Sequence, residues 1–100
     1  MPEKDETKRT MHKPFVTLEN WAVVESALSR GYQELQPGKL LTGNVFGHAK
    51  LADKKFIYTS AIVSVDRSRG LVETRNTVYH LGEASDGYKV WKYQQSAAAA

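Results

Sequence analysis

The sequence predicts an α+β domain in which one N-terminal helix packs on a mainly antiparallel sheet of about five strands, bent enough to form a small open barrel. Three observations indicate this class. β-Branched and aromatic residues, which favour strands, dominate residues 54–82. Turn residues such as Asp66, Ser68 and Gly70 interrupt that stretch at intervals too short for anything but hairpins. Apolar residues within 18–28 recur at helical spacing.

Length and composition limit the class of protein. A chain of 100 residues suits one domain with a modest core. It has no cysteine, which excludes disulfides, thiolate nucleophiles and sulfur-ligated metals. The apolar runs are far too short for a membrane span, and the charged N-terminus lacks the apolar core of a signal peptide. We therefore expect a soluble, cytoplasmic protein whose net charge of +3 permits an acidic or nucleic-acid partner.

The two ends of the chain are predicted to lie outside the fold. Residues 1–13 are rich in charge and carry a single apolar side chain after the first residue, so we interpret them as a flexible arm. Residues 94–100 end in four alanines and look like a cloning remnant, so we expect a disordered tail there. The single α+β domain is expected to span residues 14–93.

The predicted helix runs over residues 18–30. Thr17 is a favourable N-cap residue, and Val16 can pack on Trp21 as a hydrophobic staple. Gly31 would end the helix in the left-handed conformation that glycine adopts at little cost. This is the only helix that we expect.

Strands are predicted after the helix at residues 39–46, 55–65, 71–75, 77–81 and 88–93. The second is long and its alternation changes phase, which indicates either a bulge near Thr59 and Ser60 or burial of both faces. Asn76 either bends the chain between two short strands or lies within one longer strand. The loop 83–87 ends in an Asp-Gly pair and is predicted to be a hairpin connection to the last strand.

No catalytic, metal or cofactor motif is visible in the sequence. The histidines, His12, His48 and His80, show no metal-ligand spacing. If their strands were neighbours, His48 and His80 could cleave RNA by acid–base chemistry together with a lysine. A loop position for His48 and a solvent-facing strand position for His80 explain them without any reaction. We expect no enzyme, no cofactor and no metal.

Basic residues are the strongest surface signal. Between residues 39 and 80, seven lysines and arginines face three acidic residues. If their loops project to one end of the sheet, they form a basic rim beside two tyrosines, a combination with which small barrels bind single-stranded nucleic acid. The candidate binding residues are Lys50, Lys54, Lys55, Arg67, Arg69, Arg75, Tyr58 and Tyr79. Charged hairpin tips that keep a protein in solution are the alternative explanation.

Four stretches, LLTGNVFGH, TSAIVSVD, GLVETRNT and VYHLG, carry a resemblance to a known family. The chain resembles small uncharacterised proteins of bacteriophages and prophage-bearing proteobacteria. The positions that match are Gly43, Gly47, Thr59, Ser60, Ile62, Asp66, Val72, Thr74, Tyr79, Leu81 and Gly82. The resemblance covers the middle and later half of the chain and brings no catalytic residues. It implies a phage or prophage protein that acts in the cytoplasm of a bacterial host cell.

We therefore expect a non-enzymatic binding protein, an accessory factor that binds and modulates a host macromolecule such as a defence protein. A host protein is the first expected partner. A single-stranded nucleic-acid-binding module that uses the basic loops is the alternative, and a small hydrolase that uses His48 and His80 is the third hypothesis. No membrane partner is expected, and a homodimer formed through a strand edge or the helix is compatible with each hypothesis.

Overall fold

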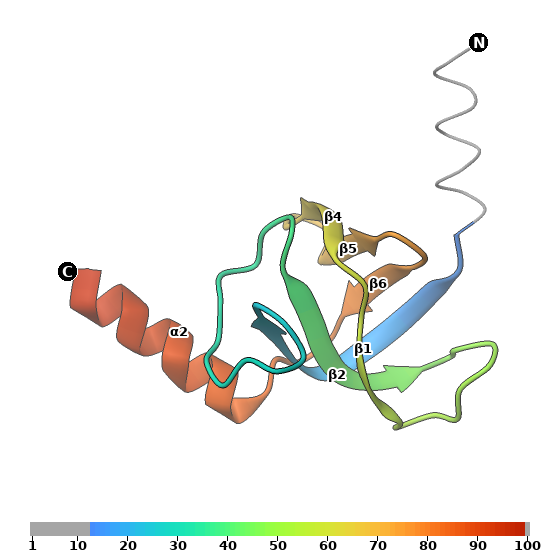
Figure 1. The fold of residues 1–100 in the computed structure, drawn as a ribbon, viewed down its shortest axis with the longest axis horizontal. Coiled ribbons are helices and arrows are strands. Elements are labelled where there is room, and N and C mark those ends of the chain that lie inside the picture. Colours follow the sequence, from blue (N-terminus) through green and yellow to red (C-terminus); the bar gives the residue numbers. More distant parts are fainter. Residues whose placement is uncertain (1–12, 100) are drawn as a thin grey trace, which may run out of the picture.

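The computed structural model describes residues 13–99, which form one sheet and one helix (Figure 1). The elements are β1 (Phe15–Val24), β2 (Leu40–Phe46), β3 (Phe56–Tyr58), β4 (Ile62–Asp66), β5 (Leu71–Thr74), β6 (Val78–Leu81) and α2 (Asp86–Ala99). The strand order is β3-β2-β1-β6-β5-β4, with β1 and β6 parallel and the other neighbours antiparallel. The α+β class is confirmed, but the helix is C-terminal and the sheet has six strands.

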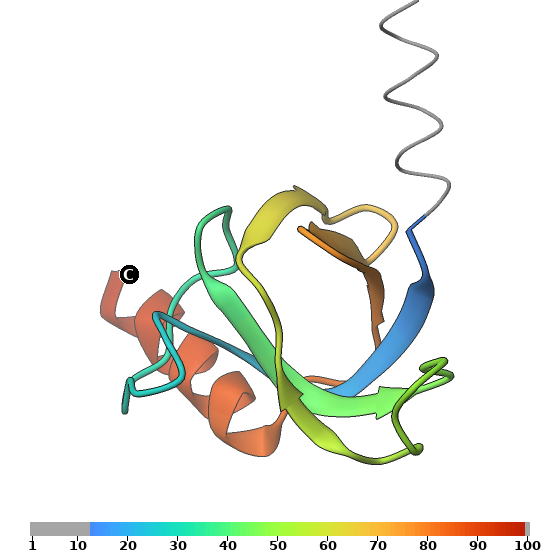
Figure 2. The same ribbon diagram turned by 45° about the vertical axis from the view of Figure 1, so that its right-hand side comes forward.

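The sheet curls because its two outermost strands follow one another in the chain (Figure 2). Only residues 59–61 separate β3 from β4. Hydrogen bonds tie this connection to the start of β2: Thr59 N–H donates to the Leu41 carbonyl at 2.9 Å, and Ile62 N–H donates to the Lys39 carbonyl at 2.8 Å. The strand order stays open, since β3 and β4 are not paired with each other. The predicted phase change near Thr59 therefore marks the passage from one end of the sheet to the other.

The inside of the curled sheet is an aliphatic core. Strand alternation explains its composition, because every second side chain of a half-buried strand points to the same face. The residues with less than 2% exposure include the aliphatic side chains Leu18, Val23, Leu41, Val45 and Val72. The opposite, outer face of the same strands carries a different set of side chains.

The segment predicted as a helix, residues 18–30, forms most of β1 and the turn after it, so that prediction is wrong. A β-bulge shifts the register with β2 between Glu19 and Ala22. The shift changes which side chains face the core: Leu18 points inward before it and Val23 after it, while Ala22 pairs with Thr42 of the outer face. The apolar residues therefore do not follow the simple alternation of a regular strand. Thr17 lies inside the strand and caps no helix.

Gly31 does not have the positive φ expected of a helix-ending glycine. It lies in the long connection between β1 and β2, where Tyr32 forms an isolated bridge with Val24. A Cβ atom added to Gly31 would meet nothing within 4 Å. Neither the backbone nor the surroundings of this residue therefore require glycine.

The last predicted strand, residues 88–93, is the first half of α2, and the loop before it leads into this helix rather than into a hairpin. Ser85 caps the helix, because its Oγ accepts a hydrogen bond from Tyr88 N–H at 3.1 Å. Asp86 in the first turn suits the positive end of the helix dipole. Tyr88 and Trp91, three residues apart, share one side of the helix, whereas in a strand they would point to opposite faces.

The ends of the chain differ from the prediction where the structure describes them. The segment 94–99, expected to be a disordered tail, continues α2, and alanine has the highest intrinsic helix propensity. Of the predicted arm, residues 1–12 lie outside the described residues. Lys13 forms an ion pair with Glu73, which lowers the pKa of that carboxyl group. No helix within residues 13–99 is long and apolar enough to cross a membrane.

Four aromatic residues attach α2 to the sheet, and we name Trp21, Tyr32, Tyr88 and Trp91 the helix-side cluster. The ring of Tyr88 lies 5.3 Å from Trp21, 5.4 Å from Tyr32 and 5.5 Å from Trp91, centroid to centroid. Its hydroxyl donates to the Gln33 carbonyl at 2.7 Å. Burial, helped by the negative charge of Glu34, raises the pKa of Tyr88 to about 12.

Candidate functional site

The outer face of the sheet carries the candidate site. Along β2, Thr42, Asn44 and Phe46 alternate with inward residues, so these three side chains share the outer face. The β-sheet register places two aromatic residues of β3 beside them, because Asn44 pairs with Phe56 and Thr42 pairs with Tyr58. β2 therefore connects two hollows that lie on this face.

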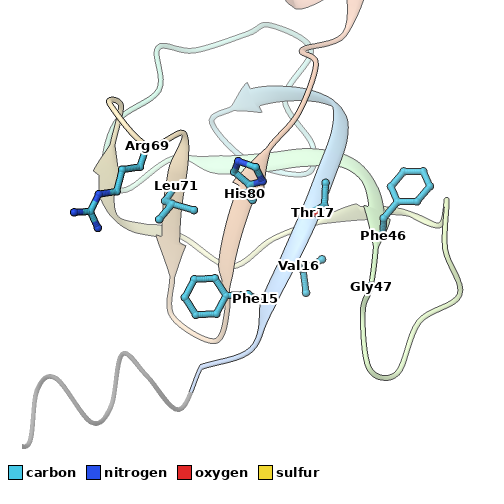
Figure 3. A pocket seen from close by; sticks show the side chains of 8 residues that line it. All are labelled: Phe15, Val16, Thr17, Phe46, Gly47, Arg69, Leu71 and His80. Carbon is cyan, nitrogen blue, oxygen red and sulfur yellow. The ribbon is translucent and has the colours of Figure 1, made fainter.

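The first hollow has a volume of about 470 Å³ and lies over a row of paired residues that crosses four strands. Figure 3 shows His80 in the middle of this row, with Phe15 and Arg69 to one side and Phe46 to the other. Phe15 is 59% exposed. We name this feature the His80 hollow; its lining consists of Phe15, Val16, Thr17, Phe46, Gly47, Arg69, Leu71 and His80.

The second hollow, of about 300 Å³, lies over β1, β2 and β3. The rings of Phe56 and Tyr58 form one wall, 5.5 Å apart and nearly perpendicular to each other. They are 51% and 49% exposed. We name this feature the Tyr58 hollow; its lining consists of Asn20, Ala22, Val24, Ser29, Arg30, Tyr32, Thr42, Phe56, Tyr58 and Ser85.

Asn44 lies between the two hollows and joins two unusual backbone positions. Its Nδ2 donates to the Lys54 carbonyl at 2.9 Å, and its Oδ1 accepts from Asn20 Nδ2 at 3.3 Å. Asn20 and Lys54, with φ of 55° and 77°, are the non-glycine residues of positive φ within residues 13–99. Such conformations cost free energy and persist where neighbouring contacts hold them. The Asn44 amide supplies those contacts at both positions.

The rim of the outer face is positively charged. Arg30 lines the Tyr58 hollow, Lys54 and Lys55 directly precede Phe56, and Arg69 lines the His80 hollow. In the part of the chain that the structure describes, Arg30, Lys54 and Lys55 form no ion pair. Arg69 lies 3.7 Å from an Asp66 carboxylate oxygen, a loose contact between exposed side chains.

The nearby carboxylates are engaged with backbone groups. Glu19 Oε1 accepts a hydrogen bond from Glu83 N–H at 2.8 Å, and Asp53 Oδ1 accepts one from Gly47 N–H at 2.9 Å. Asp66 accepts hydrogen bonds from Ser68 and from the backbone of Arg69, which lower the pKa of its carboxyl group. These acids hold turns in place, so the rim cations remain able to contact a negatively charged ligand.

The structure divides the predicted basic rim among three connections. Lys50, Lys54 and Lys55 lie in the loop between β2 and β3, and the last two directly precede Phe56 in the chain. Arg67 and Arg69 lie in the turn before β5, whereas Arg75 lies in the turn after it. Arg67 donates to the Leu35 carbonyl. Of the predicted residues, Tyr58 and Arg69 therefore line the hollows of the outer face, and Lys54 and Lys55 adjoin that face as the residues that directly precede Phe56.

Tyr79 is a buried residue and not the surface aromatic that its predicted place in the basic rim requires. It is 5% exposed, because β6 pairs it with Val16 and Val72, both of which point into the core. Burial raises the pKa of its hydroxyl group. The exposed aromatics of the outer face that sequence reasoning did not select are Phe15 and Phe56. The shared parity of Phe56 with Tyr58, directly after two lysines, was the available signal.

The histidines of the hydrolase hypothesis have separate environments. His48 Nδ1 accepts hydrogen bonds from the backbone of Lys50 at 2.9 Å and of Leu51 at 3.1 Å, so this nitrogen stabilises its loop. His48 does not line the hollow around His80, and that lining includes no carboxylate. His12 lies outside the described residues. Within residues 13–99 no group of three or more histidine and carboxylate side chains could hold a metal ion.

Comparison with known proteins adds no relative. No protein-family model matches the chain, and no curated protein and no solved structure matches it. The resemblance to phage proteins stays a prediction, and the outer face has to be interpreted from its own chemistry.

Proposed function

We propose that this protein is a binding module that holds a single-stranded nucleic acid on the outer face of its sheet. The observation that supports it most directly is the pair Phe56 and Tyr58, half-exposed at alternate positions of one strand and flanked by cations without ion-pair partners in residues 13–99. Single-strand binders combine stacking aromatics with a positive surface that follows the backbone. Exposed aromatics on a sheet stack bases in RNA-binding domains in the same way.

The size of the outer face suits a chain rather than a compact small molecule. From Thr42 to Phe46, β2 covers about 13 Å, since a strand rises about 3.3 Å per residue. The Tyr58 hollow lies at one end of this distance and the His80 hollow at the other. A strand of several nucleotides can stack a base in the Tyr58 hollow and place a phosphate near Arg69 and His80 in the His80 hollow.

The proposal is one of binding without catalysis. In the setting that the resemblance implies, a phage or prophage accessory factor of this kind would modulate its host by occupying an RNA or an unwound DNA strand. Single strands are the expected form, because their bases are free to leave their own stack and lie on a protein ring.

A host protein remains the second candidate partner, and one observation favours it. Val90 and Tyr93 of α2 are 55% and 74% exposed and lie three residues apart on the helix. Two neighbouring apolar side chains on an exposed helix face can insert into a groove of another protein. This surface is separate from the outer face, so variants can distinguish the two candidates.

Fluorescence anisotropy with labelled single-stranded DNA and RNA of about 12 nucleotides tests the proposal. Single strands should bind, and log affinity should fall linearly with log salt with a slope of about −0.7 for each phosphate that is contacted. The double variant Phe56→Ala/Tyr58→Ala should lose at least about tenfold in affinity. Arg30→Gln with Lys55→Gln should make the salt slope shallower.

The matched control is Val90→Ala/Tyr93→Ala, which removes as much exposed apolar surface from α2 and should leave nucleic-acid affinity unchanged. Retention of the wild-type affinity by the β3 variant would contradict the proposal, as would a failure of every single strand to bind at low salt. If a pull-down from bacterial lysate then captures a protein that survives nuclease treatment and is lost with the α2 variant, the second candidate replaces the first.

A further inference from the structure

We infer that the Asn20 side chain recognises the base stacked in the Tyr58 hollow, and that it prefers bases with an exocyclic amino group (adenine, cytosine and guanine) over thymine. This inference rests on the proposed function and adds a base preference to it. Its basis is the juxtaposition of a fixed amide and two exposed aromatic rings in one hollow.

The orientation of the Asn20 amide follows from its neighbours. A backbone carbonyl only accepts hydrogen bonds, so the Asn44 group that contacts the Lys54 carbonyl at 2.9 Å must be its NH₂ group. The oxygen of Asn44 therefore faces Asn20, at 3.3 Å, and Asn20 must direct its own NH₂ group there. The Oδ1 atom of Asn20 therefore points away from Asn44, and the contact with Asn44 fixes the orientation of this acceptor.

The bulge of β1 brings this acceptor to the hollow. Asn20 has φ of 55°, the side chain is exposed, and it lines the Tyr58 hollow together with Phe56 and Tyr58. Its Oδ1 accepts no hydrogen bond from another residue within 13–99. Bulges commonly redirect a side chain beside a functional site, and a strained backbone that is held by specific contacts is found at such sites.

An acceptor in this position selects a ligand that presents a donor. The amino groups N6 of adenine and N4 of cytosine carry N–H donors that project from the edge of the ring. The one ring donor of thymine, N3–H, lies between two carbonyl oxygens, which the Asn20 oxygen would repel. Because each good side-chain contact to a base edge discriminates by at least a few-fold, we expect a preference of about tenfold.

Changing the ligand tests the inference without changing the protein. Oligo(dA), oligo(dC) and oligo(dT) of equal length are compared with an oligomer that carries unsubstituted purine in place of adenine. Purine keeps the stacking ring and lacks the amino group, so it separates hydrogen bonding from stacking strength. We expect oligo(dA) and oligo(dC) to bind about tenfold more tightly than oligo(dT), and the purine oligomer to bind close to oligo(dT).

Changing the protein tests the same contact from the other side. Asn20→Gly removes the amide while glycine accepts the positive φ without strain. It should weaken oligo(dA) binding about tenfold more than oligo(dT) binding, so that the two oligomers bind the variant with similar affinity. A thermal melt shows whether the variant is folded; if it is not, the comparison of adenine with purine on the wild-type protein decides.

Equal binding of the adenine and purine oligomers would overturn the base-reading role while leaving the proposed function intact. Equal loss of oligo(dA) and oligo(dT) binding in folded Asn20→Gly would also overturn it, since it would show that Asn20 only shapes the hollow. Binding of none of the oligomers would instead remove the proposed function, and this inference with it.

Discussion

The helix-side cluster and the aromatic pair Phe56 and Tyr58 contain the same kind of ring contact but differ in how much of each ring is exposed. Tyr88 and Trp91 lie 5.5 Å apart in the cluster, and Phe56 and Tyr58 lie 5.5 Å apart in the pair. Tyr88 is nevertheless 3% exposed, whereas the two rings of the pair are half-exposed. The rings of both groups touch, so contact between rings does not explain the difference.

What separates the two groups is a covering layer. The helix α2 covers the cluster, and two of its polar atoms are hydrogen-bonded. The indole N–H of Trp21 donates to the Gly82 carbonyl at 3.0 Å, and the Tyr88 hydroxyl donates to the Gln33 carbonyl at 2.7 Å. Within residues 13–99 no helix or strand covers Phe56 and Tyr58. Burial of apolar surface stabilises the fold, whereas an exposed aromatic surface is available to a ligand. The cluster should therefore determine stability and the pair should determine binding.

The largest effect is expected for Tyr88→Ala. Truncation of this buried ring removes contacts with three aromatic neighbours and should lower the free energy of unfolding by about 3–5 kcal/mol. Urea denaturation followed by tryptophan fluorescence measures the change. A loss below about 1 kcal/mol would show that α2 does not contribute to the fold as the burial of Tyr88 indicates.

An alkaline pH should destabilise the protein through the same residue. The pKa of Tyr88 is raised from 10.0 to about 12 in the folded protein, so above pH 10 the unfolded chain releases this proton first. The stabilisation is complete below pH 10 and is lost as pH rises through 12, by about 2–3 kcal/mol. Denaturation at several alkaline pH values should show this loss, and Tyr88→Phe should reduce it.

Tyr58→Phe is the matched control for the alkaline prediction, because it removes an exposed hydroxyl group from the other aromatic group. It should keep the alkaline loss of the wild-type protein. Part of the loss should also remain in Tyr88→Phe, since burial raises the pKa of Tyr79 as well. An unchanged alkaline profile in Tyr88→Phe would contradict the assignment.

Gly43→Ala should destabilise the protein by about 1–3 kcal/mol, because a new Cβ would lie 2.8 Å from the Glu19 carbonyl oxygen and 2.9 Å from Leu18 Cγ. Both atoms belong to the segment just before the bulge that supports Asn20. The control is Gly31→Ala, where the added Cβ meets nothing within 4 Å. Thermal melts compare the two variants, and equal melting temperatures would show that β1 and β2 can separate at this point.

The smallest effect on stability is expected for Phe56→Ala/Tyr58→Ala. These rings are already half in water, so their truncation should change the free energy of unfolding by less than about 1 kcal/mol. The same urea titration as for Tyr88→Ala measures it. A loss as large as that of the Tyr88 variant would mean that the pair belongs to the core, and the distinction between the two aromatic groups would disappear.

The sequence predicted strand bounds most accurately in the middle and later part of the chain. The strands expected at residues 39–46, 71–75 and 77–81 are found within one residue of their observed bounds. The single strand predicted over residues 55–65 is wrong, because residues 59–61 divide it into β3 and β4 in place of the expected bulge or double burial. Alternation and turn residues act over a few positions, so they are readable without knowledge of the rest of the chain.

The two errors in element type have one cause. A bulge at Asn20 interrupts the alternation of β1, and the first half of α2 is rich in the aromatic and β-branched residues that favour strands. In neither segment does the local pattern alone distinguish a helix from a strand. Residue type alone also did not show which tyrosines would be exposed. Tyr58 lies at the surface as expected, whereas Tyr79 faces the core.

The sequence by itself determined that the middle of the chain forms short antiparallel strands with basic connections, because residue type and turn chemistry decide those features over a few positions. Only the tertiary structure decided that β1 lies parallel to β6, that α2 covers one aromatic group, and that Phe56 and Tyr58 stay exposed. These features depend on which face of each strand its partners bury, and that choice is made by contacts between residues far apart in the chain.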